Sequence, residues 1–176
     1  MKSILTIGKK SRVAFESLKG ISHKRVNKAL SDYTRLISVN KKRIIEANAK
    51  DVKNLKRKNV LERLILNEKK IESIIKSVNE IRKFPNPIGK ILDNWTRKNK
   101  LNIKQITTPI GVIGIIYESR PNVTADVAAL CLKSSNCAIL RGGSEAFYSN
   151  KILSNLFRKS LKKNKINENC LQFIEN

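Results

Sequence analysis

The stretch GVIGIIYESRPNVTADVAALCLKSSNCAILRGGSEA, from Gly111 to Ala146, decides the fold, because its composition differs from that of the sequence around it. Lysine, asparagine and isoleucine are frequent elsewhere, whereas only Arg120, Lys133 and Arg141 are basic here and small apolar residues dominate. Val112 to Tyr117 is a continuous apolar run, which is typical of a strand buried on both faces of a parallel sheet. The stretch therefore predicts the beginning of an α/β domain.

Helical and extended patterns alternate from this point onward. The predicted elements are a strand at Val112–Tyr117, a helix at Pro121–Ser134, a strand at Cys137–Leu140, a helix at Ser144–Lys163 and a strand at Leu171–Ile174. We expect Asn122 or Thr124 to cap the first of these helices. The order βαβαβ is that of the first half of a doubly wound parallel sheet with right-handed crossovers.

Residues 1–90 are predicted to form an antiparallel helical array. Apolar residues recur at helical spacing from Ser22 onward. A further helix is expected after Asn67, whose side chain is suited to an N-cap. Phe84-Pro85-Asn86-Pro87 ends that helix, since proline cannot continue a helix and restricts the residue before it.

Residues 91–109 are predicted to form a β-hairpin. Apolar and polar residues alternate on both sides of a polar turn at Arg97-Lys98-Asn99-Lys100. A hairpin outside a helical layer needs a surface to pair with. Packing against its own domain and docking on a neighbouring subunit as an oligomerisation arm both remain open at this stage.

The charge of the chain raises the alternative of a basic nucleic-acid-binding module. The formal net charge is +23, from 37 Lys and Arg against 14 Asp and Glu. The basic residues are spread along the polar faces of predicted helices without interleaved aromatic residues, and Lys, Asn and Ile are also the residues that AT-rich codons specify. We therefore expect only non-specific, salt-sensitive binding to nucleic acid.

The cysteines and the hydropathy point to a reducing cytoplasm. Cys131, Cys137 and Cys170 are odd in number and lack CxxC spacing, so neither a disulfide framework nor a metal site is expected. No apolar run is long enough for a signal peptide or a membrane span.

Gly142-Gly143-Ser144 follows the second predicted strand and precedes a helix. Glycines allow a backbone to approach a ligand closely, and the free N–H groups at a helix N-terminus bind anions. The alternative is a tight strand-to-helix turn with Ser144 as the N-cap. There is no GxGxxG fingerprint and no GxxxxGK[ST] loop, so this pattern alone does not specify a cofactor.

The sequence PIGVIGIIYESRPNVTADVAALCLKSSNCAILRGGSEA resembles the signature region of the γ-glutamyl phosphate reductase family, within the aldehyde dehydrogenase superfamily. The resemblance continues through four upstream pieces: EANAKD (Glu46–Asp51), LERLILNEKKI (Leu61–Ile71), PNPIG (Pro85–Gly89) and WTRKNKLNI (Trp95–Ile103). It covers nearly the whole chain in order. It implies an incomplete aldehyde-dehydrogenase-like fold in which residues 110–176 are the first part of an NADP-binding domain.

The activity implied by this resemblance is the NADPH-dependent reduction of γ-glutamyl phosphate to glutamate 5-semialdehyde and phosphate, in proline biosynthesis. In the family, a cysteine thiolate displaces phosphate from the acyl group, and hydride from NADPH reduces the resulting thioester to the aldehyde. The implied partners are a second copy of the chain, through the hairpin, and glutamate 5-kinase.

The resemblance also assigns candidate site residues. Arg141 is expected to bind the adenosine ribose or the 2′-phosphate of NADPH, with Glu145 near the ribose and Gly142, Gly143 and Ser144 at the cofactor. The alternative for Arg141 is an ion pair with Glu145 or Glu118.

Two further residues are candidates at the substrate. Asn122 is the candidate oxyanion stabiliser, with helix capping as its alternative. Arg120 is a candidate ligand of the substrate's phosphate or carboxylate.

Two departures from the family accompany these expectations. Ser135 stands where the family usually has glycine, so strain is expected there if the backbone needs a positive φ. Family members are more than twice as long, and none of the three cysteines matches their nucleophile. We therefore expect an inactive N-terminal fragment, for which a non-catalytic oligomerisation role is a further alternative.

Overall fold

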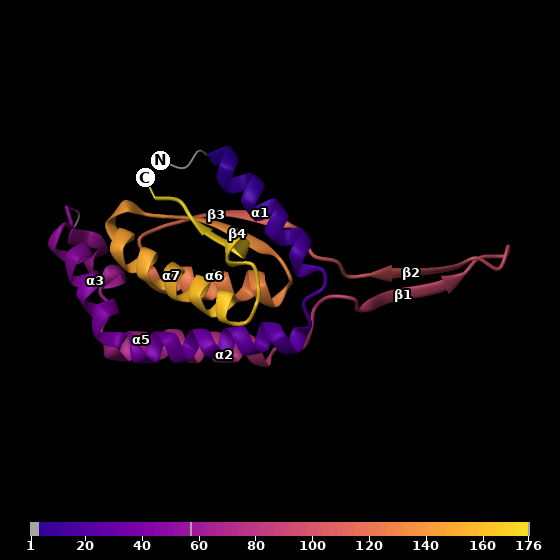
Figure 1. The fold of residues 1–176 in the computed structure, drawn as a ribbon, viewed down its shortest axis with the longest axis horizontal. Helices are drawn as coiled ribbons and strands as arrows, with labels where there is room; N and C mark the ends of the chain where they lie inside the picture. Colours follow the sequence, from indigo (N-terminus) through magenta and orange to yellow (C-terminus); the bar gives the residue numbers. More distant parts are fainter. Residues whose placement is uncertain (1–3, 57, 176) are drawn as a thin grey trace.

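The computed structural model describes residues 4–56 and 58–175, which form stacked layers with one projecting hairpin (Figure 1). The helices are α1 (Ile4–Leu18), α2 (His23–Val39), α3 (Lys41–Lys53), α4 (Leu61–Leu64), α5 (Glu68–Lys83), α6 (Pro121–Lys133) and α7 (Phe147–Lys163). The strands are β1 (Ile91–Thr96), β2 (Asn102–Ile106), β3 (Val112–Tyr117), β4 (Cys137–Gly142) and β5 (Leu171–Phe173). Short 3-10 helices lie at Lys58–Val60, Ser144–Ala146 and Glu168–Cys170.

The sheet has the order β3-β4-β5, and both pairs of neighbouring strands are parallel. Val112 pairs with Cys137, and Ala138 pairs with Leu171. Helix α6 connects β3 to β4, and α7 connects β4 to β5. The predicted βαβαβ unit, and with it the α/β fold class, is confirmed.

Helix α1 falls within the segment predicted to be helical, but it lies on the sheet face opposite α6 and α7 and not in the predicted helical array (Figure 1). Its buried positions are Ile7, Ser11, Ala14 and Leu18. Small side chains at the middle two positions let the helix approach the sheet closely, so that Cys170 Sγ lies 3.8 Å from the Ala14 carbonyl oxygen. The spacing of these four residues was the available signal.

Helices α2, α3 and α5 form a layer over α6 and α7 (Figure 1). The expected cap at Asn67 is confirmed, since Asn67 Oδ1 accepts from the Lys70 N–H at 2.9 Å. Ser22 caps α2 as well, its Oγ accepting from the Arg25 N–H at 3.3 Å. No helix among the described residues is long and apolar enough to cross a membrane.

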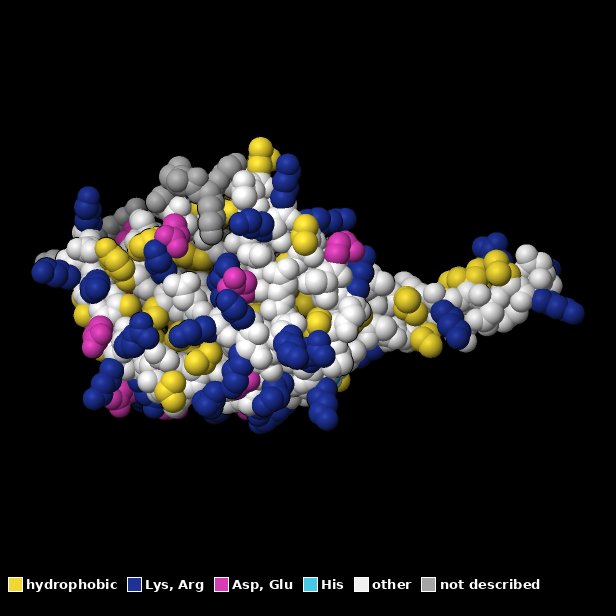
Figure 2. Space-filling model, viewed as in Figure 1, with side chains coloured by type: hydrophobic (Ala, Val, Ile, Leu, Met, Phe, Trp, Pro, Cys, Tyr) yellow, Lys and Arg dark blue, Asp and Glu magenta, His cyan; other side chains and the backbone are white. Residues whose placement is uncertain are grey.

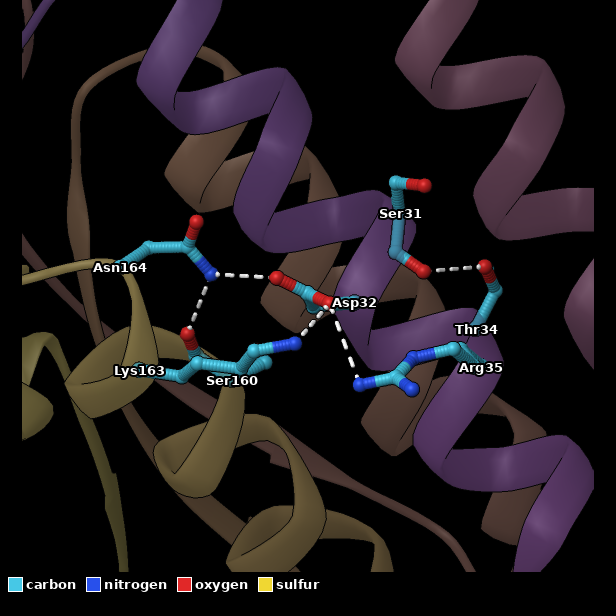
Figure 3. Close-up of polar contacts among 7 residues, drawn as sticks. All are labelled: Ser31, Asp32, Thr34, Arg35, Ser160, Lys163 and Asn164. Carbon is cyan, nitrogen blue, oxygen red and sulfur yellow. Dashed lines mark hydrogen bonds and ion pairs between the residues drawn. The ribbon is translucent and has the colours of Figure 1, made fainter.

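Contacts between α2 and α7 are both apolar and ionic. Tyr33 and Phe157 pack edge to face with ring centroids 4.9 Å apart. Beside them, the buried Asp32 accepts from Lys163 Nζ at 2.6 Å and from Asn164 Nδ2 at 3.0 Å (Figure 3). The hydrogen bond from Lys163 lowers the pKa of Asp32, against burial, which raises it.

The hairpin of β1 and β2 projects away from the layers (Figure 1). Its strands are antiparallel, with Trp95 opposite Ile103, and every residue of β1 is exposed. The predicted hairpin is therefore present and does not pack against its own domain. Apolar side chains remain exposed along it (Figure 2): Ile91, Leu92, Trp95, Leu101 and Ile106.

Ser135 adopts a positive φ of 55° directly after α6. The Asn136 N–H donates to the Cys131 carbonyl at 2.8 Å, and the Ser135 N–H donates to the Leu132 carbonyl at 3.0 Å. This pair of hydrogen bonds is the Schellman motif at the C-terminus of a helix. The motif puts the residue after the C-cap, here Ser135, in the left-handed region of the Ramachandran plot, where glycine is favoured. The strain expected at Ser135 is thus explained by how α6 ends.

Replacing Ser135 by glycine should stabilise the chain. We expect Ser135→Gly to raise the free energy of unfolding by about 0.5 kcal/mol, because the relief of the left-handed strain exceeds the added entropy of the unfolded chain. Urea denaturation measures the change. Ser134→Gly is the matched control, since Ser134 has an ordinary φ of −96° and should gain nothing. Equal effects of the two replacements would contradict the strain.

Asp32 should make the free energy of unfolding decrease at acidic pH. Because its pKa is lowered in the fold, the ionised carboxylate stabilises the fold above the unfolded-state pKa, and this stabilisation is lost as pH falls through the folded-state pKa. We expect Asp32→Asn to cost about 1 kcal/mol at neutral pH, with the difference from the parent disappearing below about pH 4. Denaturation at several pH values tests this. Asp93→Asn, in the exposed strand β1, is the control.

Candidate functional site

The carboxyl ends of β3 and β4 lie side by side, with Tyr117 opposite Gly142. Beyond β3, the buried Ser119 donates through its hydroxyl to Glu145 Oε2 at 2.7 Å. Tyr117 and Thr124 share a hydrogen bond of 2.6 Å, and Thr124 Oγ1 also donates to Asn150 Oδ1 at 2.9 Å. The sequence had not singled out Ser119, although it lies inside the YESRPNVT piece.

Gly142 and Gly143 are required by the packing of these strand ends. A Cβ added to Gly143 would lie 2.3 Å from Ser119 Oγ and 3.1 Å from the Ser119 amide nitrogen. A Cβ added to Gly142 would lie 2.3 Å from Asn150 Nδ2. Protein atoms therefore occupy both positions, so close packing accounts for both glycines without a ligand.

Arg141 presents an exposed guanidinium at the same edge. Glu118 pairs with Arg63 at 3.3 Å, so the alternative of an ion pair between Arg141 and Glu118 is wrong. The other alternative, an ion pair between Arg141 and Glu145, stays a prediction. An accessible guanidinium beside a strand end fits a phosphate or a ribose hydroxyl.

The start of α7 is capped by a residue far away in sequence. Ser144 begins the preceding 3-10 helix and makes no side-chain cap, so the interpretation of Ser144 as N-cap is wrong. Instead, the carboxylate of Asp51 accepts from the N–H groups of Tyr148 and Ser149, at 2.9 and 2.8 Å, and from Ser149 Oγ at 2.6 Å. No role was predicted for Asp51 beyond its place as the last residue of EANAKD.

Asn122 and Thr124 do not cap α6, contrary to expectation. The helix begins at Pro121, with Arg120 in the N-cap position, because proline is favoured in the first turn. Thr124 is buried in its bonds to Tyr117 and Asn150. Asn122 is exposed, and its Nδ2 lies 3.4 Å from an oxygen of Asp126, one turn further along.

A pocket of about 540 Å³ lies between α4, α5 and the beginning of α6. Both Arg120 and Asn122 line it, together with Arg63 and Lys70. Its size is in the range of small-molecule sites. The structure thus places the two candidate substrate residues in one cavity, separate from the glycine turn.

The three cysteines are free and buried. Burial raises the pKa of the Cys131 thiol to about 11, with a further contribution from Cys137. The pKa of Cys137 is raised by its contact with Cys170 and by burial. The raised pKa values disfavour the nucleophilic thiolate form of Cys131 and Cys137. That none of the three cysteines is the family's nucleophile stays a prediction.

Neither a metal site nor a basic groove is evident. Within residues 4–56 and 58–175, no cluster of three His, Cys, Asp or Glu side chains could hold a metal ion. Lys and Arg side chains are dispersed over the face seen in Figure 2 rather than gathered in one band. This distribution gives no support to a nucleic-acid-binding module.

Comparisons with known proteins match the whole chain. The γ-glutamyl phosphate reductase of Moorella thermoacetica is 42% identical over 176 residues, 98% of this chain. The crystal structure of the Thermotoga maritima enzyme of that name superposes with a TM-score of 0.93 at 39% identity, over 98% of this chain. The chain is related to the γ-glutamyl phosphate reductases. The relationship expected from the sequence is confirmed, although no model of a protein family matches.

The fold extends to more distant proteins. The Saccharomyces cerevisiae γ-glutamyl phosphate reductase has a TM-score of 0.92 at 29% identity, and a putative aldehyde dehydrogenase of Bacillus subtilis has 0.69 at 13% identity. The second likeness shows the fold alone. The chain spans about two fifths of its relatives, 42% of the Moorella protein and 42% of the Thermotoga structure.

Crowding at the glycine turn is testable by one methyl group. Gly143→Ala should lower the free energy of unfolding by about 1–3 kcal/mol, because the new Cβ overlaps Ser119. The matched control is Gly114→Ala in β3, where an added Cβ meets nothing within 4 Å. Thermal denaturation compares the two variants. If Gly143→Ala lowers the free energy of unfolding no more than Gly114→Ala does, the crowding between position 143 and Ser119 is contradicted.

Proposed function

We propose that this chain forms part of an NADPH-dependent γ-glutamyl phosphate reductase that acts in proline biosynthesis in the cytoplasm. The observation that carries the proposal is the match along 98% of the chain, at 42% identity, to the Moorella reductase. In this proposal, residues 1–90 are the helical segment, 91–109 the oligomerisation arm and 110–176 the first part of the cofactor domain. The nucleophilic cysteine is supplied by sequence outside this chain.

The cofactor is proposed to bind at the carboxyl ends of β3 and β4. There Arg141 binds the ribose or 2′-phosphate of NADPH through its exposed side chain, and Glu145 lies near the ribose. Gly142, Gly143 and Ser144 shape the turn beneath them, with the glycines held by packing against Ser119 and Asn150. When bound, NADPH supplies the hydride that reduces the acyl group.

The substrate is proposed to bind on the other side of the beginning of α6. Arg120 has no side-chain partner among the described residues, and it lines the pocket with two other cations, Arg63 and Lys70. Such a pocket attracts an anionic group of γ-glutamyl phosphate. Asn122, whose amide donates weakly at 3.4 Å to Asp126, is the proposed oxyanion stabiliser.

The hairpin is proposed to dock on a second copy of the subunit. Its apolar side chains are exposed, and it makes no packing contact with its own layers that would cover them. Loss of a complex with a full-length reductase on deletion of residues 94–109, measured by co-purification, tests this.

Glutamate 5-kinase is the proposed partner in the pathway, because it supplies the acyl phosphate.

Enzyme assay tests the reductase proposal directly. We expect the 176-residue chain alone to show no NADP-dependent oxidation of glutamate 5-semialdehyde in the presence of phosphate, since its three thiols are buried. Joined to the part of the Thermotoga reductase that the match leaves uncovered, it should show this activity, followed by NADPH absorbance. An inactive but folded chimera would contradict the proposal, as would turnover by the chain alone that disappears on replacing Cys131, Cys137 or Cys170.

The role of Arg141 is tested in the same chimera. Arg141→Ala should weaken NADPH binding about ten- to a hundredfold and NADH binding less, because a charge-assisted bond to the 2′-phosphate is lost. Fluorescence titration of each cofactor measures the two dissociation constants. An equal loss for both cofactors would assign Arg141 to the ribose or to a structural role.

A further inference from the structure

The pocket between α4, α5 and α6 contains charges of both signs. Arg63 comes from α4, Lys70 from α5 and Arg120 from the start of α6, while Asp126 lines the same pocket from the second turn of α6. Pure anion sites are lined by cations and neutral donors, because a carboxylate repels the ligand. The presence of Asp126 therefore restricts what the pocket can bind.

The cations are available to a ligand. The guanidinium of Arg120 has no partner among the described side chains and carbonyls. Arg63 pairs with the exposed Glu118 at 3.3 Å, and both side chains are more than half exposed, so this pair contributes little and exchanges readily. Lys70 Nζ donates to the Glu62 carbonyl at 2.5 Å and retains further donors.

The carboxylate of Asp126 is held in place without being neutralised. Ser77 Oγ donates to Oδ1 at 2.7 Å, and Asn122 Nδ2 lies 3.4 Å from Oδ2. Both donors are neutral. Among the side chains that the structure describes, no lysine or arginine forms an ion pair with Asp126. A fixed negative charge thus lines a cavity whose three cations do not pair with it.

We propose that this pocket binds the head group of an α-amino acid, with the cations holding the α-carboxylate and Asp126 holding the α-ammonium. This inference rests on the proposed function, and it commits Arg120 to the α-carboxylate rather than to the phosphate. A phosphate dianion next to Asp126 would be repelled, whereas the separated charges of an amino acid match those of the pocket. The cavity of about 540 Å³ accommodates such a head group with its side chain.

Asp126 is therefore a specificity-determining residue in this proposal. When a substrate without the α-ammonium occupies the pocket, it covers the carboxylate of Asp126 without supplying a positive charge. Such a substrate therefore binds with lower affinity. The side chain of the amino acid, with the reacting acyl group at its end, then lies in the rest of the pocket, which Asn122 also lines. In this proposal, the charged groups of the pocket recognise the α-ammonium and α-carboxylate of the substrate.

Binding of three small acids to the 176-residue chain tests this assignment. The probes are L-glutamate, glutarate, which lacks the amino group, and γ-aminobutyrate, which lacks the α-carboxylate. Titration followed by NMR should give an affinity for L-glutamate about tenfold higher than for either analogue. Inorganic phosphate should not displace L-glutamate.

Variants separate the two halves of the pocket. Asp126→Asn should lower the affinity for L-glutamate about tenfold and leave that for glutarate unchanged or higher, and Arg120→Ala should weaken both. Asp93→Asn, on the distant hairpin, is the matched control and should change neither. If Asp126→Asn does not fold by circular dichroism, Ser77→Ala serves instead, since it frees the carboxylate without removing its charge and should reduce the preference for L-glutamate.

The assignment is overturned if glutarate binds the parent chain as tightly as L-glutamate, if Asp126→Asn weakens both ligands equally, or if none of the three acids binds. Turnover by the chimera is a separate result. Turnover without discrimination at Asp126 removes the amino-acid assignment and leaves the reductase, whereas discrimination without turnover leaves an α-amino-acid pocket and removes the reductase.

Discussion

The interaction on which the arrangement of the layers depends is the capping of α7 by Asp51. The carboxylate is 3% exposed, and burial raises its pKa, so an ionised group there is unfavourable unless donors surround it. Three donors from Tyr148 and Ser149 provide this. Two of the three, the backbone N–H groups of Tyr148 and Ser149, belong to the first turn of α7 and have no acceptor within the helix itself. The same hydrogen bonds therefore stabilise both the buried carboxylate of Asp51 and the N–H groups at the start of α7.

Asn48, one turn earlier on α3, extends the same connection. Its amide donates to the Leu64 carbonyl at 2.8 Å and to Ser149 Oγ at 3.0 Å, and its oxygen accepts from the Leu66 N–H at 2.7 Å. The segment that carries Arg63 and the helix that follows Gly143 are thus fixed to one turn of α3. The pocket between α4, α5 and α6 and the carboxyl ends of β3 and β4 therefore share a support that is part of neither.

Features that depend on neighbouring residues could be predicted from the sequence. The strands, the hairpin and the N-cap at Asn67 follow from local patterns. The resemblance to the family gave the strain at Ser135 and located the strand ends. The cap of α7 could not be predicted, because Asp51 and Ser149 are 98 positions apart. Asp126 was read as part of a helix, and only the packing of α5 against α6 places it beside Arg120.

Helix α1 has a consequence for synthesis of the chain. It packs against β3, β4, β5 and the segment that precedes β5, so this helix is made well before the residues from Val112 to Phe173 that cover its buried face. At ribosomal rates this interval lasts about 10 to 30 s. During it Ile7, Ala14 and Leu18 lie in water beside the exposed Leu5 and Val13, so the nascent helix offers an apolar surface on which chaperones act.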